Sequence, residues 1–206
     1  MKLSSPSDMD LLIVFSSESR SASEPELVTR FFENGLEIFH LRKPGAAAAQ
    51  LNKYLKAIPD QFHNRIVIHS HFQLGSEFGL KGIHTNADSG VSASFHSTSE
   101  IENCPYPFSH IFLSPVFDSI SKPGYTSRFD LAKLAVFLNN RKTKNNSAPK
   151  IIALGGISAS NILEIKKYGF DGAAVLGSIW ESKDPLGSFL EIQGFCRKRR
   201  RTLHSF

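Results

Sequence analysis

The sequence predicts an α/β protein, a compact (β/α)8 barrel, from two observations. Eight short apolar runs alternate with helical or short connections, which is typical of a parallel sheet. The last two runs, residues 150–158 and 170–180, each end in glycine and a hydroxyl residue before a helix. In such barrels the loops after the seventh and eighth strands often bind phosphate, because free backbone N–H groups attract anions there. The predicted phosphate cup consists of Gly155, Gly156, Gly177 and Ser178. The alternative is that these glycines only form tight turns.

The first six strands are expected where β-branched and aromatic residues cluster between turn signals. They are residues 11–15, 38–42, 65–69, 82–86, 91–95 and 110–114. The seventh and eighth strands are the two glycine-terminated runs. Only residues 87–90 separate the fourth strand from the fifth, which leaves a short connection without a helix.

Helices are expected in most of the other connections. Pro25 opens the first one, because proline suits the first helical position, and Asn34-Gly35 ends it. Residues 46–57, 71–78 and 130–139 contain further helix formers, and Pro185 starts the last helix. Residues 97–103 begin with Ser97 and Glu100, a capping-box spacing. Ser160-Asn161 caps the helix between the last two strands.

Composition favours one soluble domain over residues 1–206. Residues 1–10 are polar, no apolar run reaches the roughly 20 residues of a membrane span, and only two cysteines are present, so we expect a cytoplasmic protein without a membrane partner. The five basic residues 197–201 account for the whole net charge of +5. We interpret residues 197–206 as a frayed basic tail rather than a nucleic-acid arm, since no nucleic-acid motif accompanies it. The sequence is also compatible with a homo-oligomer.

Polar residues follow one face of several strands. Side chains alternate along a strand, so the face that carries His40 also carries Arg42. The same alternation sends a set of polar side chains to one barrel mouth: His40, Arg42, His69, Asn86, Ser94 and His96. Burying these groups without partners would cost about 1–3 kcal/mol each, so a wet cavity that binds an anion or a metal is expected. The alternative is a satisfied polar network that caps the barrel.

An ordered set of motifs resembles the thiamine-phosphate synthase / TenI family. The motifs are residues 39–43, 82–84, 94–97, 114–122, 153–157 and 171–179, and the similarity runs from about Leu11 to Phe195. The resemblance implies a (β/α)8 barrel. It also implies a transferase of thiamine biosynthesis, whose partners are a hydroxymethylpyrimidine diphosphate and a thiazole phosphate. Pyrophosphate is released with the help of Mg²⁺.

The resemblance also assigns roles residue by residue. Arg42 falls at the diphosphate arginine, and Lys122 at the lysine that closes the loop after the sixth strand. Further positions match substrate-binding residues: Ser94, Ser119, Ser121, Gly155, Gly156, Gly177 and Ser178. His40 replaces a glutamine beside the pyrimidine, and Lys43 is a lysine displaced by one position. Asp88 is the remaining candidate for a metal carboxylate, also displaced by one.

Other positions depart from the synthase pattern. His69-Ser70 stands where the family has Asn-Asp, whose aspartate binds the metal. A TenI-like thiazole tautomerase or thiazole-phosphate-binding protein is therefore the second hypothesis, although Pro115 replaces the histidine of that branch. His69 or His96 would then transfer the proton, because histidine titrates near neutral pH. A third hypothesis is a metal-dependent hydrolase, based on His69, His71 and the other mouth histidines.

Overall fold

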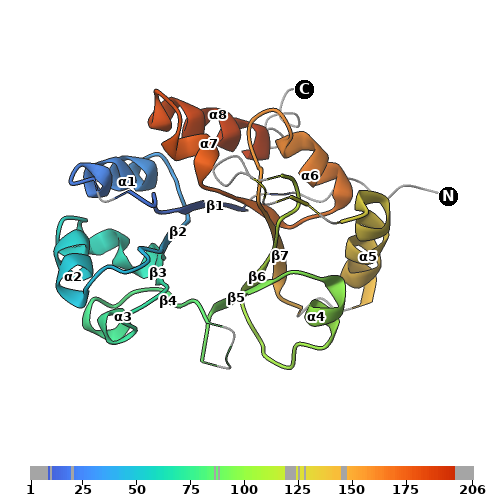
Figure 1. Ribbon diagram of the computed structural model, residues 1–206, viewed down its shortest axis with the longest axis horizontal. Coiled ribbons are helices and arrows are strands. Elements are labelled where there is room, and N and C mark those ends of the chain that lie inside the picture. The colour runs from blue at the N-terminus through green and yellow to red at the C-terminus, as the bar shows by residue number, and fades with distance from the viewer. Residues whose placement is uncertain are drawn as a thin grey trace, which may run out of the picture.

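The computed structural model describes Met9 and residues 11–19, 21–85, 87, 89–118, 124, 126–127, 129–144 and 148–197. Its eight parallel strands form a nearly closed barrel in the order β4-β3-β2-β1-β8-β7-β6-β5 (Figure 1). The strands are β1 Leu11–Phe15, β2 Ile38–Leu41, β3 Ile66–Ile68, β4 Gly82–Ile83, β5 Ser92–Phe95, β6 His110–Leu113, β7 Lys150–Leu154 and β8 Gly172–Val175. The (β/α)8 barrel predicted from the sequence is confirmed.

The seam of the barrel lies between β4 and β5. There the strands are joined by a single parallel bridge between His84 and Ser92, with N–H groups of Thr85 and Val91 bonded across it. The expected strand over 82–86 is only two residues long, and no helix occurs in the described part of the β4–β5 connection. The absence of a helix follows from the short connection, which has too few residues to form one over the seam.

Helices surround the strands (Figure 1). They are α1 Glu24–Glu33, α2 Ala48–Lys56, α3 Gln73–Glu77, α4 Thr98–Glu102, α5 Leu131–Lys144, α6 Ile162–Tyr168, α7 Gly177–Trp180 and α8 Pro185–Arg197. A 3-10 helix, η1 Asp60–Arg65, which the sequence did not predict, precedes β3. The helix expected over 130–139 extends to Lys144 as α5. In α4, Ser97 accepts a hydrogen bond from the Glu100 N–H, as the capping spacing predicts.

Two apolar layers lie on opposite faces of the strands. Side chains on the outer face of the strands, which include Phe39, Leu41 and Ile151, pack against the helices. Side chains on the inner face, such as Ile13, Phe15 and Phe112, fill the inside of the barrel. This separation follows from the alternation of side chains along each strand. It also decides which polar residues face the barrel interior.

None of the described helices combines the length and the apolar character needed to cross a membrane. The basic residues 198–201 and the polar residues 1–8 lie outside the described part of the chain.

Candidate active site at the barrel mouth

A cluster of four histidines lies inside the barrel, which we call the histidine cluster: His40, His69, His84 and His110. His40 is on β2 and His110 on β6, while His69 and His84 directly follow β3 and β4. His40 and His110 are almost fully buried. Parallel strands bring these residues together from four separate segments, because inward-facing positions of one barrel share a common interior.

Hydrogen bonds connect the rings in a chain. Nδ1 of His40 lies 2.9 Å from Nε2 of His69, and Nε2 of His40 lies 3.2 Å from Nε2 of His110. Ser109 Oγ lies 2.9 Å from Nδ1 of His110 and ends the chain. The Ser109 hydroxyl donates to the Val91 carbonyl oxygen at 3.1 Å and therefore accepts from His110. The tautomers that satisfy the chain then have His69 donating to His40, His40 to His110, and His110 to Ser109. All three imidazoles are then neutral.

His84 stacks beside this chain. Its ring lies 4.2 Å from that of His69, centroid to centroid, and is nearly parallel to it. Its Nδ1 lies 2.9 Å from Ser92 Oγ and its Nε2 lies 3.1 Å from Ser94 Oγ. The two hydroxyls therefore hold the ring plane, since the protonated nitrogen of His84 donates to one serine and the other nitrogen accepts from the other serine.

Burial keeps the histidine cluster uncharged. It lowers the pKa of His69 to about 2, of His110 to about 3 and of His84 to about 4, and that of His40 falls well below its ordinary value. Desolvation is the largest cause for each ring, and the positive charge of Arg42 adds to it for His69 and His84. At neutral pH the cluster therefore consists of neutral imidazoles, each with one nitrogen that carries a proton and one that carries a lone pair.

The mouth above the cluster is open and carries charged side chains of both signs. The Arg42 side chain is 39% exposed, and its guanidinium lies 3.5 Å from the Glu18 carboxylate. A cavity of about 550 Å³ adjoins the cluster and is lined by His84, Thr85, Ser94, Phe95, His96 and Glu100. His96 is at its rim, with Nδ1 2.8 Å from the Ser114 carbonyl oxygen. Of the predicted mouth residues, the structure thus brings together Arg42, His69, Ser94 and His96, with His40 buried beneath them and bonded to His69.

The two glycine bends lie next to each other, because β7 pairs directly with β8. Gly155 and Gly156 both have positive φ angles, +97° and +65°. A Cβ on Gly155 would lie 2.8 Å from Cα of Pro115, and one on Gly156 would overlap the Asp118 carbonyl oxygen. Packing against the loop after β6 therefore already requires both glycines. In this respect they are tight turns, and their binding of phosphate stays a prediction.

A hydroxyl group without a partner lies beside these bends. Gly177 begins the short helix α7, and Ser178 follows it. Among the described side chains, the Oγ of Ser178 is buried without a hydrogen-bond partner. Leaving a buried hydroxyl unsatisfied costs about 1–3 kcal/mol, so a bound group with acceptor oxygens would compensate for it.

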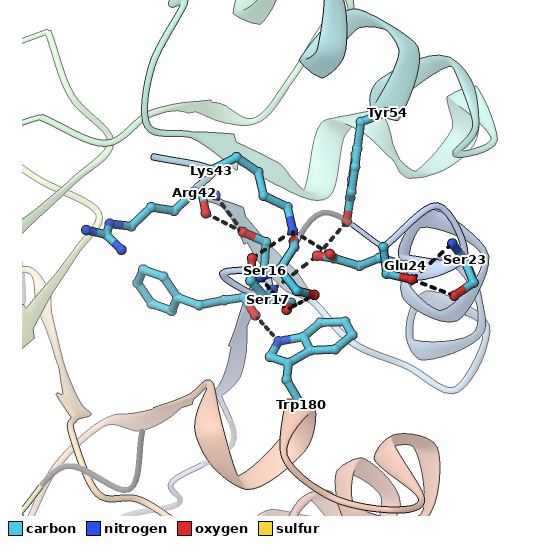
Figure 2. A network of polar contacts seen from close by, with 11 residues as sticks. Ser16, Ser17, Ser23, Glu24, Arg42, Lys43, Tyr54 and Trp180 are labelled. Carbon is cyan, nitrogen blue, oxygen red and sulfur yellow. Dashed lines mark hydrogen bonds and ion pairs between the residues drawn. The ribbon is translucent and has the colours of Figure 1, made fainter. Parts of the chain in front are cut away.

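Lys43 does not reach the mouth (Figure 2). Its ammonium group is buried on the outer face of the barrel wall, where it pairs with Glu24 and donates to the carbonyl oxygens of Ser17 and Ser19 at 2.7 and 2.6 Å. The reason is alternation: since Arg42 faces the mouth, the next side chain faces the helices. The structure gives no support to the predicted substrate contact of Lys43.

Several predicted residues lie outside the described part of the chain. They are Asn86, Asp88, Ser119, Ser121 and Lys122. His71 is described, and its Nε2 lies 2.8 Å from the Ala46 carbonyl oxygen. It has a positive φ of 53°, so the strand has ended before it and it does not join His69 in a common site.

Sequence reasoning missed His84 and His110 as members of the cluster. His84 has the same parity as Asn86, and His110 has the same parity as Phe112, which faces the barrel interior. The alternation that identified His40 and Arg42 would have found both, had it been followed to the start of each strand.

The described donors do not fit Mg²⁺. This ion prefers carboxylate and other oxygen ligands, whereas the interior supplies imidazole nitrogens. Of the described carboxylates near the mouth, Glu18 pairs with Arg42 and Glu100 accepts the His96 N–H at 2.8 Å. One ring nitrogen from each of His40, His69 and His84 lies within 4.8 Å of the others. Such a set suits a nitrogen-binding transition metal.

Comparison with known proteins agrees with this architecture. A family model described as thiamine monophosphate synthase (TMP-TENI) matches residues 11–179. The thiamine-phosphate synthase of Leuconostoc citreum is 25% identical over 179 residues, which cover 77% of this chain and 82% of that protein. The thiamine phosphate pyrophosphorylase of Bacteroides thetaiotaomicron is 32% identical, with a TM-score of 0.75, over 90% of this chain and 96% of that one.

A second solved structure shows the same fold at lower similarity. The thiamine phosphate pyrophosphorylase of Pyrococcus furiosus is 18% identical, with a TM-score of 0.71, over 92% of this chain and 96% of that one. The named relatives are transferases. Because the family model covers most of the chain, from β1 to α7, the protein belongs to the thiamine-phosphate synthase / TenI family.

Proposed function

We propose that the chain is a thiamine-phosphate synthase, which joins a hydroxymethylpyrimidine diphosphate to a thiazole phosphate and releases pyrophosphate. One observation supports this most directly. The Arg42 guanidinium and the paired glycine bends after β7 and β8 lie at the C-terminal ends of the strands, where barrel enzymes place their active sites. An arginine and a glycine bend are the groups that two separate phosphate-bearing substrates would need.

The reaction needs charge neutralisation at the leaving group. As the bond between the pyrimidine methylene carbon and the diphosphate breaks, negative charge grows on the departing oxygen. Arg42 would stabilise this charge, since its guanidinium is partly exposed and its surface ion pair with Glu18 is weak enough to exchange. Lys122 is predicted to add a second positive charge.

The second substrate is expected at the glycine bends. The backbone N–H groups of Gly155, Gly156 and Gly177 would hold the thiazole phosphate, with Ser178 Oγ donating to it. Ser119 and Ser121 are predicted to contribute from the loop after β6. Fixing the phosphate there would place the thiazole nitrogen in line with the pyrimidine methylene carbon.

The floor of the pyrimidine site would be polar and neutral. His40 is fully buried and bonded on both nitrogens to other histidines, so it would act through His69. His69 and Ser94 are partly exposed and His96 is exposed, so these three side chains would contact the pyrimidine or move a proton. A neutral site suits a carbocation-like pyrimidine, because cationic imidazoles would oppose its formation.

The experiment is a synthase assay with both substrates and either Mg²⁺ or Mn²⁺. We expect thiamine phosphate from the wild type and a decrease of about 10²–10³-fold in kcat/KM for Arg42→Ala. Arg30→Ala, on the last turn of α1, is the matched control and should retain full activity. Wild-type protein that is folded but forms no thiamine phosphate would refute the proposal. Dependence on Mg²⁺, with Asp88 as a ligand, is tested in the same assay.

The absence of carboxylate donors in the described interior favours one alternative, a TenI-like thiazole tautomerase or thiazole-phosphate-binding protein. It predicts that thiazole phosphate binds without any metal ion. Calorimetric titration in the presence of EDTA measures this directly, and Ser178→Ala should weaken the binding. A cytoplasmic location and a homo-oligomer stay predictions that cell fractionation and light scattering would check.

A further inference from the structure

The histidine cluster buries several imidazole rings that a purely structural barrel interior would not require. His40, His69 and His84 belong to or directly follow three neighbouring strands, and one ring nitrogen of each lies within 4.8 Å of the others. The nearest pair, Nδ1 of His40 and Nε2 of His69, are 2.9 Å apart. An apolar interior of the same volume would avoid the cost of desolvating these rings, so their retention needs a reason.

The spacing is close to that of a metal site. Zinc–nitrogen bonds of about 2.0–2.1 Å in a tetrahedron place ligand nitrogens roughly 3.3 Å apart. The three nitrogens lie within 4.8 Å of one another, with the nearest pair at 2.9 Å. Tetrahedral binding needs ring rotations that move nitrogens by about 1–1.5 Å and turn the His84 ring out of its stack with His69, and the adjoining cavity leaves room beside His84.

The surroundings supply the outer hydrogen bonds that such ligands use. A metal-bound histidine donates its other ring N–H to a neighbouring acceptor. His40 has Nε2 of His110 at 3.2 Å for this purpose, and His84 has serine hydroxyls on both nitrogens. Because Ser109 donates to the Val91 carbonyl oxygen, His110 donates to Ser109 and accepts from Nε2 of His40, which leaves Nδ1 of His40 without a proton and available to a metal ion.

The charges nearby favour an anionic fourth ligand. The charged groups that act most on these histidines are all cations: Arg42 on His69 and His84, and Lys81 and Lys150 on His110. A divalent ion held by three neutral imidazoles retains its full charge. Its remaining position would therefore take a hydroxide or a substrate oxygen, as in metal sites with three protein ligands.

We propose that His40, His69 and His84 form a binding site for a divalent transition-metal ion of the zinc class inside the barrel. The ion would be bound by nitrogen, in contrast to the oxygen-bound Mg²⁺ that the family resemblance implies. The proposal does not depend on the synthase reaction, because metal binding is measured without either substrate.

The test is a titration of EDTA-treated, full-length protein with Co²⁺, followed by competition with Zn²⁺. Cobalt absorbs visible light when bound by nitrogen in a tetrahedral site, so the spectrum reports the ligands. We expect one equivalent to bind wild-type protein and to be displaced by Zn²⁺. His69→Ala should weaken binding at least about 100-fold, whereas His96→Ala, a mouth histidine outside the set, should bind normally.

Circular dichroism establishes that each variant is folded. If His69→Ala does not fold, His69→Gln replaces it, because the amide retains a hydrogen bond to His40. Three outcomes would overturn the proposal: no stoichiometric binding by folded wild type, undiminished binding by the His69 variant, or displacement of Co²⁺ by millimolar Mg²⁺, which would indicate an oxygen site.

Discussion

The end of β2 sends polar side chains into two buried regions on opposite sides of the barrel wall. Inside lies the histidine cluster, to which His40 belongs. Outside lies the Lys43 network, formed by Lys43, Glu24, Tyr54 and Ser17. Figure 2 shows Lys43 directed toward Glu24 and Arg42 directed the other way. Both regions bury several nitrogen and oxygen atoms, although His40 and Lys43 are close together in the sequence.

The two regions differ in how their charge is compensated. In the Lys43 network an ammonium group meets a carboxylate, and Tyr54 O–H donates to Glu24 at 3.0 Å. Burial raises the pKa of Glu24, although Lys43 opposes this, and it raises that of Tyr54 well above 10. The histidine cluster has no such counter-charge among its described contacts and stays neutral. A compensated region holds the fold together, whereas an uncompensated one is available to a ligand.

The largest expected effect comes from breaking the compensated region. Lys43→Met leaves the Glu24 carboxylate buried without its partner, so the free energy of unfolding should fall by about 3–5 kcal/mol in urea denaturation. Arg42→Met is the matched control. Its ion pair with Glu18 is exposed, and its loss should cost about 0–1 kcal/mol. Equal losses in the two variants would contradict this difference between the regions. Lys43→Met combined with Glu24→Leu should recover only part of the stability, because the Tyr54 O–H and the Ser17 N–H then lose their acceptor.

The second-largest expected effect is a decrease in the free energy of unfolding as the pH falls, caused by the histidine cluster. The folded cluster stays neutral down to its lowered pKa values of about 4, 3 and 2, whereas unfolded histidines take up protons below about pH 6.5. Stability is therefore fully present above pH 6.5 and is lost as the pH falls. Between pH 7 and 6 the loss should be about 0.7 kcal/mol for each histidine, roughly 2–3 kcal/mol in all.

Urea denaturation at the two pH values, with EDTA present, measures this loss. Glu24 changes the stability in the opposite direction. Its pKa is raised in the folded state, so the folded protein binds a proton more readily and gains stability as the pH falls. The His84→Gln variant isolates the histidine contribution and should lose about 0.7 kcal/mol less than wild type over the same range. A wild-type stability that does not change between pH 7 and 6 would show that the cluster is not held neutral.

The smallest expected effect concerns Ser16, which lies between the two regions. Its buried Oγ accepts the Arg42 N–H at 2.8 Å and donates to the Arg42 carbonyl at 2.7 Å. Ser16→Ala should cost about 1–2 kcal/mol, because both Arg42 backbone groups lose a partner. Ser76→Ala, an exposed serine in α3, should change stability by no more than about 0.5 kcal/mol. Thermal unfolding of both variants would separate these values, and an unchanged Ser16 variant would show that water replaces the hydroxyl.

The barrel itself could be predicted from local signals. Strand positions followed from apolar runs, and α1 and α4 followed from a proline and a capping serine. The extents of β4 and α5 were predicted incorrectly, since strand length depends on the partner across the seam and not on the apolar run alone. The interior could be predicted only in part: alternation placed His40 and Arg42, but following strands only at their C-terminal ends left out His84 and His110.

The sequence alone determined the alternation of strands and helices, the positions of the two glycine bends and the parity of each strand, because these depend on residues close together in the chain. The tertiary structure decided which imidazoles meet and what Lys43 contacts. His40 lies 29 residues from His69 and 70 from His110, and Lys43 lies 19 from Glu24. Such contacts depend on which strands become neighbours when the barrel forms and on the helix that covers each one, and no local pattern encodes that arrangement.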